Sequence, residues 1–75
     1  MVEPWTLEEL RESKNMTQSE LAEQFSVSTK TIQNMEKDSG NIKHKLLKKY
    51  MLFFNKNYDD IFLGNKYENF VRKAS

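Results

Sequence analysis

The chain has 75 residues, a net charge of +1 and no cysteine. This length suffices for one small domain, which buries roughly 60–65 % of the surface of its unfolded chain. Without cysteine the chain forms no disulfide and no zinc–thiolate site, so a cytoplasmic location is the simplest interpretation. No apolar run approaches the ~18–20 residues of a membrane helix, and residues 1–5 lack the features of a signal peptide. We therefore expect a cytoplasmic protein with no membrane partner.

The positive charge is concentrated in the middle of the chain. Residues 1–25 carry two basic and six acidic side chains, whereas residues 26–49 carry six lysines and two acidic residues. A polyanion responds to such a local patch rather than to the net charge of the whole chain. The pattern is compatible with a nucleic-acid partner, and equally with a solvated lysine-rich surface.

Three short helices are predicted in the first half of the chain. They span about residues 7–15, 18–25 and 29–37. The first two begin with capping boxes, formed by Thr6 with Glu9 and by Thr17 with Glu20. Ser28 is placed to cap the third helix. In each helix the apolar residues fall on one face, which indicates that the three helices pack on a shared core.

The second half is predicted to add two more helices. Five apolar residues recur at helical spacing over about residues 43–55, namely Leu46, Leu47, Tyr50, Met51 and Phe54. A short fifth helix follows over about residues 57–64. No segment alternates apolar and polar residues long enough to predict a strand. The expected fold class is therefore all-α, with a five-helix domain over residues 1–64 and a tail over residues 65–75.

The link between the second and third predicted helices is very short and consists of Ser26, Val27 and Ser28. Such a link cannot let the helices run antiparallel, so it holds them at a steep angle with Val27 at the corner. The later helix then protrudes as a rod that fits a DNA major groove. The sequence thus predicts a helix-turn-helix over about residues 18–37.

A specific residue series resembles that of the lambda repressor/Cro-like (XRE-type) helix-turn-helix regulators, over about residues 7–63. The series is Thr17-Gln18, Leu21-Ala22, Val27-Ser28, Ile32 and Glu36. This resemblance implies a lambda-repressor-like DNA-binding domain in a small phage Cro-like or bacterial transcriptional regulator that acts as a repressor. Ser26 departs from the pattern, because the family often has glycine in this turn, and we expect a less strained or differently turned backbone there.

The candidate base contacts lie on the third predicted helix. Its outward residues are Thr29, Lys30, Gln33 and Asn34. Asparagine and glutamine pair with adenine through two hydrogen bonds, and lysine reaches the acceptors of guanine. A solvated face would use similar residues, although amides and short hydroxyls are poor choices for solubility alone. Given the helix-turn-helix, we predict that these side chains contact bases.

The candidate phosphate contacts lie on two other segments, and the family resemblance supports both. They are Gln18, Asn41, Lys43, His44 and Lys45. The last three begin the fourth predicted helix, where the helix dipole disfavours cations. A cationic helix start is explained if a DNA phosphate docks there, and equally if the helix begins further along the chain.

The resemblance also implies a structural salt bridge between Arg11 and Glu36, which orients the third helix. No metal site is expected, because His44 has no second histidine or cysteine beside it. No cofactor, small-molecule ligand or enzymatic activity is expected either, because so short a chain lacks room for a sizeable pocket. Five acidic residues are interpreted as surface charges and caps rather than an acid/base pair, namely Glu8, Glu9, Glu12, Glu20 and Glu23.

The expected partners are a double-stranded DNA operator and a second copy of the chain. A two-fold dimer interface is predicted from apolar residues near the C-terminus: Ile61, Phe62, Tyr67, Phe70 and Val71. The alternative is that the tail folds back on its own core. Two other functions stay open, a DNA-binding antitoxin or restriction–modification controller, and a protein-interaction module that binds a second regulator protein.

Overall fold

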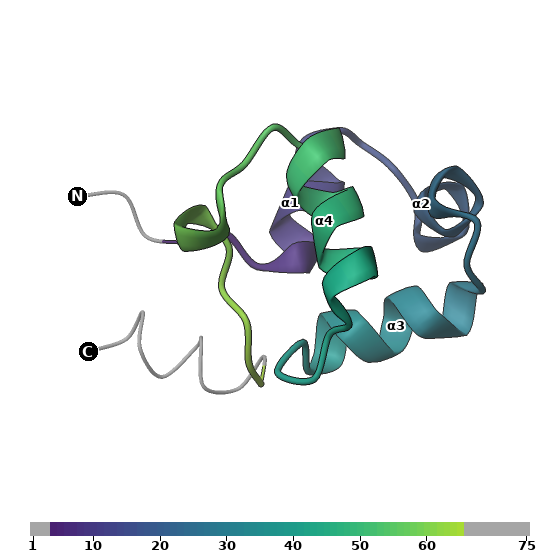
Figure 1. Ribbon diagram of the computed structural model, residues 1–75. Coiled ribbons are helices and arrows are strands. Elements are labelled where there is room, and N and C mark those ends of the chain that lie inside the picture. Colours follow the sequence, from purple (N-terminus) through teal and green to yellow (C-terminus); the bar gives the residue numbers. More distant parts are fainter. Residues whose placement is uncertain (1–3, 66–75) are drawn as a thin grey trace.

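The computed structural model describes residues 4–65, which form four α-helices and one short 3₁₀ helix (Figure 1). The elements are α1 (Leu7–Ser13), α2 (Gln18–Phe25), α3 (Thr29–Lys37), α4 (His44–Phe53) and η1 (Tyr58–Asp60). Within the described residues there is no strand beyond two isolated bridges. The predicted all-α fold class is confirmed. None of the helices in this range is both long and apolar enough to cross a membrane.

The starts of α1, α2 and α3 follow the predicted capping chemistry. The Thr6 hydroxyl accepts from the Glu9 amide at 3.1 Å, and the Glu9 carboxylate accepts from the Thr6 amide at 2.9 Å. Thr17 and Glu20 form the same reciprocal pair at 3.1 and 2.8 Å. Ser28 caps α3 through its hydroxyl. These side chains satisfy backbone N–H groups that a first helical turn leaves without partners, and so they fix where each helix begins.

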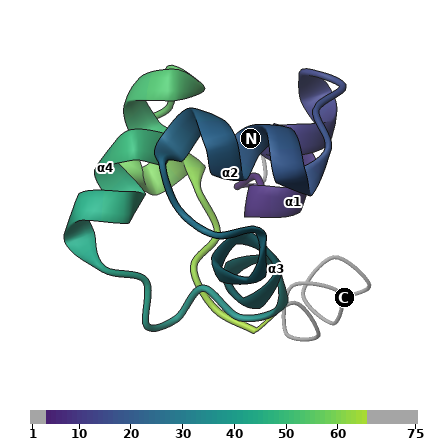
Figure 2. The ribbon, with the colours of Figure 1, turned by 90° about the vertical axis from the view of Figure 1, so that its right-hand side faces the viewer.

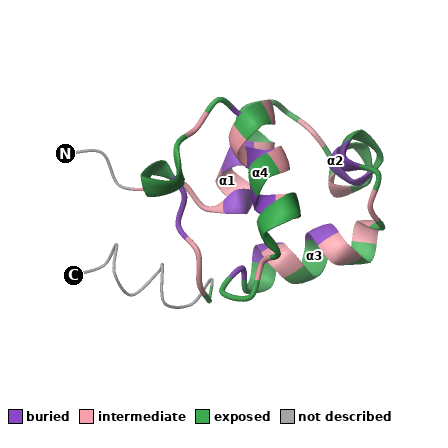
Figure 3. Cartoon of the chain, in the orientation of Figure 1, coloured by how far each residue is buried: buried purple, intermediate pink, exposed green. Residues whose placement is uncertain are grey.

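The core lies where all four helices meet the chain that follows η1 (Figure 3). Its buried residues are Leu7, Leu10, Leu21, Ala22, Phe25, Ile32, Leu47, Tyr50, Phe54 and Ile61. Phe25 of α2 packs edge-on against Tyr50 of α4, with ring centroids 4.9 Å apart. Burial raises the pKa of the Tyr50 phenol. Each large apolar side chain buried here stabilises the fold by about 1.5–3 kcal/mol.

Helix α3 lies at one edge of the molecule. Figure 2 looks along α3, which lies below α2 with α4 on one side and α1 on the other. The buried residues of α3 are Ile32 and Glu36. The opposite side of the helix therefore faces away from the rest of the domain and is accessible to a partner.

The fifth helix is shorter than predicted. It consists of the single 3₁₀ turn η1, and the chain after it is extended rather than helical up to residue 64. The Phe62 amide donates to the Trp5 carbonyl at 2.8 Å, and the Ser39 amide donates to the Gly64 carbonyl at 3.0 Å. Because these backbone groups bond to distant parts of the chain, they are not available for helical hydrogen bonds.

The expectation of a less strained or differently turned backbone at Ser26 is wrong. Ser26 has φ 58° and ψ 43°, which is the left-handed conformation that glycine adopts most readily. Its amide donates to the carbonyls of Ala22 and Glu23 at the end of α2, and the Val27 amide donates to Ala22 at 2.9 Å. The turn therefore has the left-handed geometry that glycine usually provides, with serine in its place.

Candidate nucleic-acid interface

A buried ion pair holds α3 against α1. The Arg11 Nε donates to Glu36 Oε2 at 2.7 Å, and an Arg11 terminal nitrogen donates to Glu36 Oε1 at 3.2 Å. The two side chains are only 12 % and 5 % exposed. The hydrogen bond to Glu36 raises the pKa of Arg11, against the opposing effect of burial. This two-point contact fixes the orientation of the guanidinium as well as its distance.

The same carboxylate also ties α3 to α2. The Gln18 Nε2 donates to Glu36 Oε1 at 2.9 Å. The other terminal nitrogen of Arg11 donates to the Met16 carbonyl at 2.8 Å, in the link between α1 and α2. Both α1, through Arg11, and α2, through Gln18, therefore bond to the same residue of α3. We call Arg11, Gln18 and Glu36 the brace, because together they fix the position of α3.

Three of the four predicted base-contact residues lie on the outer side of α3. Lys30, Gln33 and Asn34 are exposed and line a polar hollow of about 440 Å³, together with Gln18. The fourth, Thr29, is half-buried, and its hydroxyl oxygen lies 3.5 Å from that of a serine in α2. The structure thus brings together side chains with both donors and acceptors on one protruding surface.

Sequence reasoning missed one member of this surface. Lys37 lines the same hollow and is exposed at the end of α3. It follows Lys30 and Asn34 at positions i+7 and i+3, so the three residues share one side of the helix. This spacing can be read from the sequence and would have placed Lys37 on the same surface.

The predicted phosphate-contact residues of the second half lie together at the start of α4. Asn41, Lys43, His44 and Lys45 are all exposed, and α4 begins at His44, as the cationic-start interpretation requires. Lys43 is the N-cap, but it makes no side-chain capping bond, and the first turn has no acidic residue. The start of α4 therefore combines a first turn that no side chain caps with exposed lysines, an arrangement that favours an anion.

The lysines of this surface are accessible to a partner. Among residues 4–65, none of Lys30, Lys37, Lys43 and Lys45 forms an ion pair. All four are exposed. The surface formed by α3 and the start of α4 is consequently positive, as binding to the phosphates of DNA requires.

The predicted dimer residues fall into two groups. Ile61 and Phe62 are buried in their own chain, with exposed fractions of 5 % and 7 %. Tyr67, Phe70 and Val71 lie outside the described residues. No group of side chains in residues 4–65 is arranged to hold a metal ion.

Comparison with known proteins agrees with this geometry. The model of a helix-turn-helix family matches residues 7–61, which covers all four α-helices and η1. No curated protein matches the chain. The matched range includes the brace, the outer side of α3 and the start of α4. The chain belongs to the lambda repressor/Cro-like (XRE-type) helix-turn-helix family of DNA-binding regulators.

Proposed function

We propose that the chain is a sequence-specific transcriptional regulator of the cytoplasm, acting as a repressor by docking α3 into the major groove of an operator. The observation that carries the proposal is the outer side of α3, where Lys30, Gln33 and Asn34 are exposed on a helix held by the brace. Exposed amides and an ammonium group match the donors and acceptors of base edges. Binding there would block access to a promoter.

The phosphate contacts are assigned to both flanks of α3. Gln18 donates one amide hydrogen to Glu36 and keeps a second donor for a phosphate oxygen. On the other flank, Asn41, Lys43, His44 and Lys45 surround the start of α4. Contacts on both flanks set the register of α3 in the groove, while the base contacts supply the sequence preference.

A homodimer completes the proposed mechanism. One recognition helix buries little surface and gives modest affinity on its own. Two copies that read half-sites about one helical turn apart combine their contacts. We assign the two-fold contact to Tyr67, Phe70 and Val71 near the C-terminus.

The test is a selection of binding sites from random double-stranded DNA, followed by two substitutions. Lys30→Ala and Asn34→Ala should each reduce the preference for the selected site over random DNA, by ~1–3 kcal/mol. Lys48→Ala and Gln24→Ala are matched controls, because both residues are exposed and neither lies on α3. Full preference in both α3 variants would overturn the assigned contacts. Failure to select any site would overturn the function and favour a protein-interaction module.

A further inference from the structure

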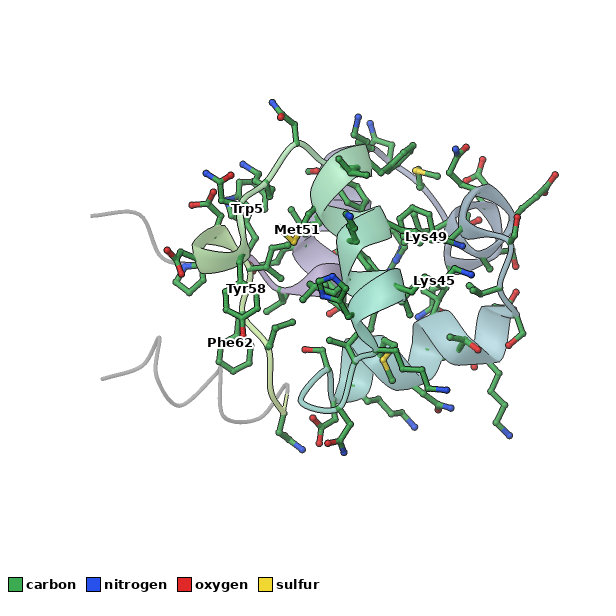
Figure 4. The ribbon with its side chains drawn as sticks, viewed as in Figure 1. Trp5, Lys45, Lys49, Met51, Tyr58 and Phe62 are labelled. Carbon is green, nitrogen blue, oxygen red and sulfur yellow. The ribbon has the colours of Figure 1, made fainter. Side chains whose placement is uncertain are left out.

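A second groove lies on the α4 side of α3. It has a volume of about 480 Å³, and its lining comes from the α2–α3 turn, α3, the loop that follows and α4. Its floor is apolar and consists of Val27, Met35 and Leu46, all partly buried against the core. Its rim carries lysines of the α4 region, namely Lys43, Lys45 and Lys49. Figure 4 shows Lys45 and Lys49 extending from the side of α4 that faces α2 and α3.

The rim of this groove has one sign of charge. No carboxylate lines it. Lys49 donates to the Phe25 carbonyl at 2.6 Å, at the end of α2, where the helix dipole favours a cation. Lys43 and Lys45 form no ion pair with any residue in the described part of the chain. The groove therefore attracts a negatively charged occupant.

Binding of DNA alone does not explain why the floor of the groove is apolar. The base-facing residues Lys30 and Asn34 line the hollow on the α1 side of α3, whereas Thr31 and Met35 line this groove on the other side. The phosphate backbone beside Lys43 and Lys45 presents anionic oxygens and no apolar side chain to cover Val27, Met35 and Leu46. An occupant that fits the groove must combine apolar groups with negative charge.

We propose that this groove binds an acidic amphipathic segment of a protein partner, with apolar side chains on the floor and carboxylates toward the lysines. Lys45 and Lys49 are one helical turn apart, a spacing of about 5–6 Å that successive turns of an amphipathic segment also present.

Occupation of the groove excludes DNA. This step rests on the proposed function, because it uses Lys43 and Lys45 as phosphate contacts. Both lysines also form the groove rim, so a carboxylate and a phosphate compete for them. The partner would therefore release the regulator from its operator, and the two ligands should weaken each other's binding by the same factor.

The experiment first selects short random peptides for binding to the full chain in the absence of DNA. The enriched peptides should combine net negative charge with two or more apolar residues. Binding of one synthesised peptide is then measured by fluorescence anisotropy. Lys49→Gln should weaken peptide binding about tenfold, which corresponds to the loss of one charge-assisted hydrogen bond. The substitution Lys48→Gln at the neighbouring residue should leave the affinity for the peptide unchanged. Lys48 is exposed and does not line the groove, so it is a matched control.

Several outcomes overturn the proposal. One is enrichment of peptides without acidic residues, and another is an equal effect of Lys48→Gln. Binding of oligoglutamate as tight as that of the selected peptide would show diffuse attraction and no use of the floor. If Lys49→Gln lowers the melting temperature, Lys45→Gln serves in its place, because Lys45 is exposed. Self-association of the chain that Lys49→Gln abolishes would identify the occupant as a second copy instead.

Two further measurements separate the groove from the DNA function. Methyl signals of Val27, Met35 and Leu46 should shift when the peptide is added without DNA. Failure of those shifts overturns the groove whatever the chain does with DNA. Displacement of the labelled peptide by a double-stranded DNA fragment tests the competition. A peptide that stays bound under saturating DNA would overturn the mutual exclusion.

Discussion

At the residue scale, Ser26 links a single backbone conformation to the angle between α2 and α3. Its left-handed φ of 58° closes α2 and lets Val27 turn into the corner. This conformation costs an L-residue roughly 1–2 kcal/mol, because Cβ approaches the neighbouring carbonyl. The sequence could not reveal the cost, since serine at this position is also compatible with an unstrained turn.

Ser26→Gly should stabilise the domain by about 0.5–1 kcal/mol. Glycine removes the strain at this position, although it adds some entropy to the unfolded chain. The measurement is urea unfolding followed by circular dichroism. Ser28→Gly is the control, because Ser28 has an extended backbone and its hydroxyl caps α3, so its loss should not stabilise. An unchanged or lower midpoint for Ser26→Gly would contradict the strain argument.

The contribution of the brace to stability depends on both of its charged residues, Arg11 and Glu36. Arg11→Met leaves the Glu36 carboxylate buried without its main partner, and should cost about 3–5 kcal/mol of unfolding free energy. The double variant Arg11→Met with Glu36→Leu should recover most of that loss, because no lone charge stays buried. Both are compared by urea unfolding, with Arg11→Lys as a milder variant that keeps the charge. If the double variant is less stable than the single one, lone-charge burial does not explain the loss.

At the element scale, the sequence predicted the helices whose signals are local. The starts of α1, α2 and α3 depend on side chains three residues apart, such as Thr6 with Glu9. The outer side of α3 followed from helical periodicity alone. The extended chain after η1 was not predictable, because it depends on Phe62 bonding to Trp5 at the other end of the domain. The groove beside α4 escaped prediction for the same reason, since Val27 and Leu46 meet only through packing.

Substitutions at the start of α4 should affect DNA binding differently from substitutions on α3. Lys43→Ala and Lys45→Ala should weaken binding almost equally on all DNA sequences. Each should also reduce the slope of log affinity against log salt by about one unit per lost phosphate contact. Filter binding or anisotropy over a range of salt concentrations measures the slope. Lys48→Ala, further along the same helix and exposed, should leave it unchanged. Unchanged slopes in both test variants would show that the two lysines do not contact phosphates.

At the scale of the whole molecule, one small domain divides its surface between several tasks. The outer side of α3 is assigned to bases, the start of α4 to phosphates and the groove between α3 and α4 to a protein segment. The last described residues, Gly64 and Asn65, lie next to these surfaces. The Gly64 amide donates to the Ser39 hydroxyl at 3.0 Å, and Asn65 forms a bridge with Asp38 beyond the end of α3. Asn65, the last residue that the structure describes, therefore lies beside the loop that leads into α4.

The bridge between Asn65 and Asp38 determines where the chain can be shortened to test the proposed dimer. A chain that ends at Asn65 keeps the bridge to Asp38 and the whole described core, so it should fold with an unchanged melting temperature. It loses Tyr67, Phe70 and Val71, which carry the proposed two-fold contact now that Ile61 and Phe62 are known to be buried in their own chain.

The expected result is a dimer for the full chain and a monomer for the shortened one, measured by light scattering. Affinity for a two-half-site operator should fall with the dimer, while affinity for a single half-site stays the same, because the contacts of α3 are unaltered. A substitution of Phe70 by serine in the full chain should have the same effect if the contact is apolar. A shortened chain that stays dimeric would place the two-fold contact outside residues 66–75. A full chain that binds its operator as a monomer would show that binding does not need the dimer.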